Sequence, residues 1–157
     1  MKIKDILEKK GSAVRTIGPN ETIVELIRRL CDHRIGALVV VGNDGGIAGI
    51  VSERDVLRET GELLRQHADP ARAATAAAPK RVKDVMTRSL VIGVPDDTVD
   101  YVMGVMTRNR IRHLPVVEHN KLIGIVSIGD LVNAILRETT YENRMLMDYI
   151  HGAIAVG

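Results

Sequence analysis

The sequence contains very few aromatic residues and no strong excess of either charge. Of its 157 residues none is Phe or Trp and three are Tyr, so aliphatic side chains must fill the core. The formal net charge is +2, and acidic and basic residues are interspersed along the chain. Proteins that bind nucleic acids usually combine a basic face with aromatic side chains that stack on bases. Because this chain has neither feature, we expect no nucleic acid partner.

Cysteine and long apolar segments are also scarce. The single cysteine, Cys31, excludes a disulfide within the chain and fits a reducing compartment. We expect it to be a small core residue on a helix. Residues 1–5 are not followed by a long apolar region, so we expect no secretory signal. The longest apolar run, Ile35 to Val41, is far shorter than the roughly 20 residues of a membrane-spanning helix. These absences predict a cytoplasmic protein without a membrane partner.

One sequence pattern occurs twice in the chain. Gly49-Ile50-Val51-Ser52-x-x-Asp55 recurs as Gly124-Ile125-Val126-Ser127-x-x-Asp130. The copies differ in length by one residue, at the predicted turns 42–46 and 118–121. Turns tolerate such changes, whereas a shift within a strand would move its side chains to the wrong face. The pattern indicates two copies of one folded unit, and because units of roughly 60 residues are marginal alone, we expect them to share a core or pack together.

Each copy is predicted to fold in the order strand, helix, strand, strand, helix. The first copy starts with a short helical pattern that ends at Gly11, and Asn20 or Thr22 can cap its main helix. Its strands are expected at residues 14–17, 37–41 and 47–52, and its second helix in the segment after Ser52. In the second copy, after a lead-in at 82–86, the same elements are expected at residues 90–94, 98–109, 113–117, 122–126 and 128–137.

The domain boundaries follow from this repetition. We predict one domain at 1–66, an Ala-rich and partly helical linker at 67–80, a second domain at 81–140, and a C-terminal helix and tail at 141–157. Three residues of the C-terminal helix are four apart and share one face: Tyr141, Met145 and Tyr149. That stripe predicts packing against the first domain or against a partner chain, and we expect a homodimer.

The repeated motif has a structural interpretation and a functional one. A Ser that ends a strand, followed three residues later by an acid, is typical of a capped helix N-terminus. The preceding Gly, which a cap does not require, lets another backbone or a planar ligand come close. A carboxylate in the first helical turn can accept the two hydroxyls of a ribose, and the helix N-terminus offers N–H groups to a phosphate. The two interpretations are compatible.

These features resemble a tandem pair of CBS domains, the module often called a Bateman domain. The resemblance covers about residues 1–140 and rests on the order of elements, on both copies of the motif and on residues 110–117, Arg-Ile-Arg-His-Leu-Pro-Val-Val. It is similar in pattern to stand-alone bacterial members. The resemblance implies an α/β (α+β) fold in which two β-α-β-β-α units pack with pseudo-twofold symmetry through their sheets. It also implies two clefts between the units that bind an adenine nucleotide: AMP, ADP, ATP or NAD.

The resemblance further implies which residues meet the nucleotide. Those near the adenine are Thr16, Ile35, Gly36 and Ala37 in the first unit and Ile92, Arg112 and His113 in the second. Ribose hydroxyls are expected at Asp55 and Asp130. Phosphates are expected at Ser52, Ser127, Arg112 and His113. The variable pair of the motif adds Arg54 in the first unit and Gly129 in the second.

The two units also differ in the residues at their expected clefts. Small residues at 36–37 leave room for a ring, whereas Arg112 and His113 supply charge for a phosphate. We therefore expect two unequal clefts, with Arg112 and His113 belonging to the second unit and Arg54 to the first.

We find no motif that would predict an enzyme or a metal site. The sequence has no Ser-x-x-Lys, no P-loop and no placed Cys–His dyad. Four histidines share no metal-ligand spacing and are expected at the surface: His33, His67, His119 and His151. We expect a regulatory module whose ligand changes its shape or its affinity for an unidentified protein partner. The alternative is a ligand-independent dimerisation scaffold in which Ser-x-x-Asp only caps helices.

Overall fold

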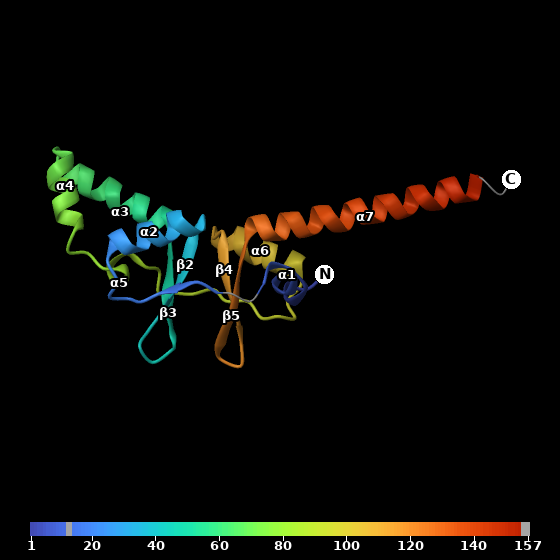
Figure 1. The fold of residues 1–157 in the computed structure, drawn as a ribbon, viewed down its shortest axis with the longest axis horizontal. Coiled ribbons are helices and arrows are strands. Elements are labelled where there is room, and N and C mark those ends of the chain that lie inside the picture. Colours follow the sequence, from blue (N-terminus) through green and yellow to red (C-terminus); the bar gives the residue numbers. More distant parts are fainter. Residues whose placement is uncertain (12–13, 155–157) are drawn as a thin grey trace.

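The structure is a computed structural model that describes residues 1–11 and 14–154, with side chains up to residue 150. Along the chain, its elements are α1 (Ile3–Lys10), β1 (Thr16–Ile17), α2 (Ile23–His33), β2 (Ala37–Val41), β3 (Ile47–Ser52), α3 (Glu53–Gln66), α4 (Pro70–Ala77), α5 (Val82–Val85), α6 (Val99–Asn109), β4 (His113–Glu118), β5 (Lys121–Ser127) and α7 (Ile128–Ile154). Figure 1 shows the two hairpins side by side at the centre, with α2 and α3 beside one and α6 and α7 beside the other. The predicted α+β class is confirmed.

The sheets are small, and the first is more complete than the second. β1 pairs in parallel with β2, which pairs antiparallel with β3, and β4 pairs antiparallel with β5. The predicted strand at 90–94 is wrong, because only Gly93 pairs, with Val116. The Gly93 N–H donates to the Pro115 carbonyl, and the Val117 N–H donates to the Gly93 carbonyl. In this register the next bond would need an N–H at residue 115, which proline lacks.

The main helix of each half begins and ends in the same way. Thr22, rather than Asn20, caps α2, and its Oγ1 accepts the Glu25 N–H at 3.0 Å. Thr98 caps α6 in the same manner. Both helices end at an arginine in the left-handed conformation, Arg34 with φ 50° and Arg110 with φ 53°. The duplication read from the sequence therefore extends to the details of the backbone.

Each hydrophobic core includes a short helix from the opposite half of the chain. Ile3 and Ile6 of α1 lie in the core of the second half, with residues of α6, β4, β5 and α7. Val82 of α5 lies in the core of the first half. In Figure 1, α1 lies beside α6 and β5, and α5 lies below α2. The division of the chain at 67–80 thus separates two sequence copies, whereas the two cores exchange a helix.

The exchange explains the glycine that both copies of the motif retain. Ile50 and Thr87 bond in both directions, at 3.0 and 2.9 Å, and a Cβ on Gly49 would lie 2.7 Å from the Thr87 carbonyl oxygen. A Cβ on Gly124 would lie 2.5 Å from Cδ2 of Leu7 on α1. The expected close approach at these glycines is therefore made by the chain itself, by a backbone at Gly49 and by a side chain at Gly124.

The linker is partly helical and the C-terminal segment is a helix, as expected, whereas the cysteine is not a core residue. α4 packs on α3 through the buried Ala73, so much of the linker is ordered. Cys31 lies on α2 but is exposed, because one residue beyond the buried Leu30 the helix has turned by about 100°. α7 runs on beyond the body of the molecule (Figure 1). Tyr141, Met145 and Tyr149 are 66%, 54% and 77% exposed, so they do not pack against the first domain, and their packing against a partner chain stays a prediction.

Candidate functional site

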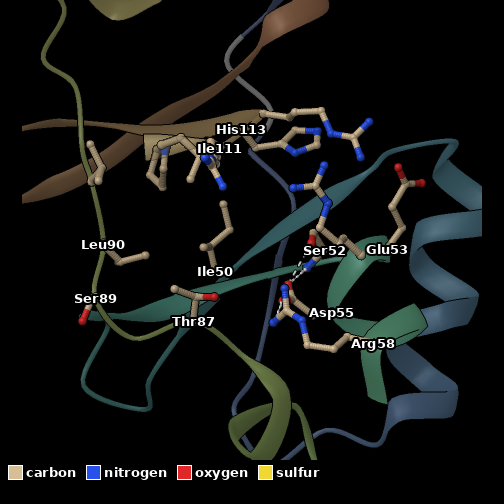
Figure 2. Close-up of a pocket in the computed structure, with 15 residues that line it drawn as sticks. Ile50, Ser52, Glu53, Asp55, Arg58, Thr87, Ser89, Leu90, Ile111 and His113 are labelled. Carbon is tan, nitrogen blue, oxygen red and sulfur yellow. Dashed lines mark hydrogen bonds and ion pairs between the residues drawn. The ribbon is translucent and has the colours of Figure 1, made fainter. Parts of the chain in front are cut away.

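Two clefts lie between the halves of the molecule, and each contains one copy of the repeated motif. We call the cleft at Ser52 and Asp55 cleft one and the cleft at Ser127 and Asp130 cleft two. Figure 2 shows cleft one, with Ile50 and Ser52 on one side and Ile111 and His113 on the other. Each motif stands where a strand of the sheet passes into a helix, β3 into α3 and β5 into α7.

Each cleft is built from both halves, as expected of clefts that lie between the two units, so residues listed for one unit need not share a cleft. Cleft one joins the motif of the first half to residues 110–113 and 87–91 of the second. Cleft two joins the motif of the second half to residues 34–37 of the first. The physical reason is that the halves face each other through their sheets, which places the start of β4 opposite the end of β3. Charges expected in separate clefts, on Arg54 and Arg112, consequently meet in cleft one.

The structure places most of the predicted site residues in these clefts. Those that line cleft one are Ser52, Arg54, Asp55, Arg112 and His113. Those that line cleft two are Ile35, Gly36, Ala37, His113, Ser127 and Asp130. Those that line neither cleft are Thr16, Ile92 and Gly129. The Thr16 carbonyl accepts a bond from Arg29, Ile92 faces solvent, and Gly129 lies in the first turn of α7.

Asp55 is a buried carboxylate at the N-terminus of α3. It is 8% exposed, and its Oδ2 accepts the Ser52 N–H at 2.8 Å and the Ser52 hydroxyl at 2.7 Å. Among the described residues, its Oδ1 accepts a single long bond of 3.4 Å, from Arg58, whose side chain is 68% exposed. The expected role at the helix N-terminus is thereby confirmed for Asp55, and Oδ1 keeps capacity for a further donor.

Asp130 repeats this arrangement at the N-terminus of α7, with one addition. Its Oδ2 accepts the Ser127 N–H at 2.7 Å and the Ser127 hydroxyl at 2.8 Å, and the Ser127 Oγ accepts the Asp130 N–H. The addition is Lys10, whose Nζ lies 2.6 Å from Oδ2. Burial opposes ionisation of Asp130, but the bonds from Lys10 and Ser127 outweigh it and hold the pKa below its ordinary value.

Basic side chains outnumber acidic ones in both clefts. Those of cleft one are Arg54, Arg58, Arg110, Arg112 and His113, which face the acids Glu53 and Asp55. Those of cleft two are Lys10, Arg15, Arg34 and His113, which face Asp130. A cleft with an excess of positive charge attracts anionic ligands.

His113 lines both clefts, and its ring lies so close to residue 36 that this residue must be small. A Cβ on Gly36 would lie 3.0 Å from both Cε1 and Nε2 of the ring. Burial lowers the pKa of His113, and the repulsion of Arg112 and Lys10 acts in the same direction. The opposing attraction of Glu53 is insufficient to reverse the shift. The imidazole therefore sits at the junction of the clefts in a setting that favours its neutral form.

Several cleft residues escaped sequence reasoning. Arg110 and Ile111 repeat Arg34 and Ile35, and that repetition was the signal that could have identified them. Lys10 gave no signal, because only the exchange of α1 brings it to the second motif.

The remaining expectations concern metals and membranes. Among the described residues, no group of three His, Cys, Asp or Glu side chains is placed to hold a metal ion. His33 and His119 are exposed and His67 is half-buried, whereas the side chain of His151 lies outside the described residues. None of the helices in the described part of the chain has both the length and the apolar character to span a membrane.

Comparison with known proteins agrees with this architecture. The family model of the CBS domain matches the chain at residues 3–62 and 82–137. The CBS domain-containing protein CBSX3, mitochondrial, of Arabidopsis thaliana is 34% identical over 158 residues, which cover 96% of this chain and 72% of that protein.

Solved structures show the same fold. The CBS-domain containing protein ATU1752 from Agrobacterium tumefaciens has a TM-score of 0.74 and 38% identity, and the match covers 85% of this chain and 92% of that one. The CBS domain pair of protein MJ0100, in complex with 5′-methylthioadenosine and S-adenosyl-L-methionine, has a TM-score of 0.70 and 26% identity, covering 88% and 98% of the two chains. The chain therefore belongs to the CBS domain family and carries one copy of the domain in each half.

Proposed function

We propose that the protein is a regulatory module that binds an adenosine-containing ligand, such as AMP, ADP, ATP or NAD, in cleft one. The observation that carries this proposal is the position of Asp55. Its buried carboxylate lies at the N-terminus of α3 and in the wall of the cleft, and within the described part of the chain Oδ1 accepts one long bond, from Arg58. The hydroxyls of a ribose are suitable donors to that oxygen.

The rest of cleft one matches the other parts of such a ligand. Ile50, Leu90 and Ile111 offer apolar surface to an adenine ring. Arg54 and Arg112 offer guanidinium groups, which pair well with phosphate oxygens. The two ligands named for the MJ0100 domain pair share an adenosine group, which supports this class of ligand.

The proposed regulation follows from the composition of the cleft. A ligand in cleft one contacts β3 and α3 of the first half together with β4 and residues 87–91 of the second. It therefore favours the arrangement of the halves that it binds best, and it shifts the population toward that arrangement. Because binding is the whole proposed activity, incubation with ATP should release no phosphate.

Isothermal titration calorimetry tests the proposal with AMP, ADP, ATP, NAD and S-adenosyl-L-methionine. We expect Asp55→Asn to weaken binding by roughly tenfold or more, as loss of a hydrogen bond to a charged group does. Asp44→Asn, in the β2–β3 turn, is the matched control and should bind as the wild type does. Absence of heat with every ligand would contradict the proposal. If Asp55→Asn lowers the stability of the protein but not its affinity for the ligand, Asp55 serves only to cap the helix.

We also propose that two copies associate through the projecting part of α7. Tyr141, Met145 and Tyr149 are exposed there together with Leu146 and Ile150. Large apolar side chains that gather on an exposed surface mark a site of association with another protein. Sedimentation should show a dimer for the full chain and a monomer for a chain that ends at Thr140. A dimer that forms without any ligand binding would instead favour the scaffold interpretation.

A further inference from the structure

A second cavity adjoins cleft two, in the groove between α1 and α7. Its volume is about 200 Å³, and α1 lies beneath the first turns of α7 in Figure 1. Lys10 and Asp130 line both this cavity, which we call the side groove, and cleft two, whose own volume is about 340 Å³. The other residues that line the side groove come from the N-terminal segment and from α7: Met1, Ile6, Lys9, Asn133, Ala134 and Arg137.

The side groove carries an excess of positive charge. Lys9 and Arg137 are exposed, and within the described residues the side chain of neither forms a hydrogen bond or an ion pair. The acid that lines the groove, Asp130, already accepts the Lys10 ammonium at 2.6 Å. An anion can therefore pair with Lys9 and Arg137, and a phosphate suits them because a guanidinium binds its oxygens through two parallel hydrogen bonds.

Arg137 can act close to Asp130 although it lies two turns further along α7. Seven residues advance a helix by about 10 Å. The side chains of a helix tilt toward its N-terminus, which shortens this gap for a side chain as long as arginine. Both residues accordingly line the same cavity.

The equivalent position in the first half carries the opposite charge. Asp130 follows Asp55 by 75 residues, and at the same spacing Arg137 corresponds to Glu62. The cation nearest to Asp55 in α3 is Arg58, which is already bonded to that carboxylate. A phosphate placed beyond Asp55 along α3 would approach the Glu62 carboxylate, whereas one placed beyond Asp130 along α7 approaches a guanidinium. Position 137 therefore distinguishes the two clefts.

Asp130 stands at the border between cleft two and the side groove. In the described part of the chain its Oδ2 accepts the bonds from Ser127 and Lys10, and its Oδ1 accepts none. A ribose hydroxyl that donates to Oδ1 lies at this border. The 2′ and 3′ oxygens of a ribose are on adjacent carbon atoms, so the second oxygen lies at the border too. A phosphate ester on that second oxygen can extend into the side groove.

We propose that the side groove binds a phosphate carried on the ribose of the ligand in cleft two. The ligand class of cleft two is then an adenosine nucleotide with a phosphate on its 2′ or 3′ oxygen in addition to the 5′ phosphate. Lys9 and Arg137 bind the ribose phosphate, and Asp130 accepts the remaining ribose hydroxyl. This inference rests on the proposed function, because it assumes that Asp130 recognises a ribose as Asp55 does.

Isothermal titration calorimetry with 5′-AMP, adenosine 2′,5′-bisphosphate and adenosine 3′,5′-bisphosphate tests the inference. In the wild type we expect one site per chain that binds one of the bisphosphates roughly tenfold or more tightly than AMP, as an added hydrogen bond between charged groups does. The isomer that shows the gain identifies the esterified oxygen. Arg137→Met and Lys9→Met should each reduce the gain, and the double variant should abolish it without changing the affinity for AMP.

The design leaves cleft one intact, because neither Lys9 nor Arg137 lines it. Arg144→Met is the matched control, since it removes the same charge two turns further along α7, outside the side groove, and should keep the gain. Both substituted side chains are exposed, so the variants should unfold in urea as the wild type does.

The outcomes separate this inference from the proposed function. Bisphosphates that bind no more tightly than AMP, or a gain that survives in the double variant, would overturn the role of the side groove. The proposed function would still stand in that case if Asp55→Asn weakens the binding of AMP. Absence of binding of every nucleotide to the wild type would overturn both.

Discussion

Leu7 and Gly124 are in contact across the exchanged helix, and the contact leaves no room for a side chain at position 124. A Cβ there would lie 2.5 Å from Leu7 Cδ2, and an equivalent Cβ on Gly49 would lie 2.7 Å from the Thr87 carbonyl oxygen. The two glycines occupy the same place in the repeat, yet one faces the end of a flexible side chain and the other faces backbone.

The first prediction follows from that difference. Gly49→Ala should lower the free energy of unfolding by about 1–3 kcal/mol, the range for overpacked cores. Gly124→Ala should cost less, because Leu7 can rotate and the Thr87 carbonyl cannot. Urea denaturation measures both. In a Leu7→Ala background the cost of Gly124→Ala should nearly vanish, whereas equal costs in the two backgrounds would contradict the contact.

The second prediction concerns Asp96, which joins the loop before α6 to α1. Hydrogen bonds from Lys2 and Lys4, with their positive charges, lower its pKa to about 2 from an ordinary 3.8. A carboxyl with a depressed pKa stabilises the fold above its unfolded pKa, and that stabilisation is lost as the pH falls from about 4 to about 2. NMR titration of the carboxyl carbon should give the low value.

The controls for the Asp96 prediction replace nearby lysines and vary the salt concentration. Replacing Lys2 and Lys4 together with Met should return the pKa of Asp96 toward its ordinary value, and Lys9→Met should leave it low. High salt should also raise it, since exposed ion pairs are screened. An Asp96 pKa near 3.8 in the wild-type protein would show that these bonds do not form in solution.

The third prediction concerns His113. The pKa of His113 is lowered by burial, so the unfolded chain takes up a proton at a higher pH than the native state does. The free energy of unfolding should therefore fall as the pH drops through 6.5, the ordinary value. The charges that act on the ring are Glu53 and Asp130, which favour protonation, and Lys10 and Arg112, which oppose it.

Denaturation at a series of pH values between about 7.5 and 5.5 measures this effect. His113→Gln should flatten the dependence, and His119→Gln should leave it unchanged because His119 is exposed. A wild-type protein whose stability is constant over this range would contradict the prediction.

The fourth prediction concerns the two threonine caps. Thr22→Ala and Thr98→Ala each remove the oxygen that accepts an N–H in the first turn of a helix, and each should cost about 1 kcal/mol of unfolding free energy. Thr75→Ala is the matched control, because its hydroxyl bonds within α4. Thermal unfolding should show similar losses for the two caps and little change for the control.

Local patterns carried most of the fold prediction, and non-local pairing produced its errors. The hairpins and main helices depend on residues a few positions apart, so the periodicity of the apolar residues located them, although the first cap stayed open between Asn20 and Thr22. The strand at 90–94 failed because its pairing depends on Pro115, more than twenty residues later.

In the clefts, too, local patterns could be predicted from the sequence and non-local contacts could not. Ser52, Asp55, Ser127 and Asp130 could be recognised from one repeated motif, and Arg112 and His113 from the start of the second strand of the second copy. Which motif faces which strand depends on how the halves pack, and no short pattern encodes that. The contact of Lys10 with Asp130 joins residues 120 positions apart, so it could be found only in the structure.

The exchange of helices also affects the order in which parts of the protein fold during synthesis on the ribosome. Translation produces α1 well before its partners in the second core, and Asp130, the partner of Lys10, follows Lys10 by 120 residues. At about 5–20 residues per second, that delay is roughly 6–24 s. During this time the apolar face of α1, with Ile3 and Ile6, has no core to join. α1 is thus made long before the core in which it packs, and its docking must wait for the second half of the chain.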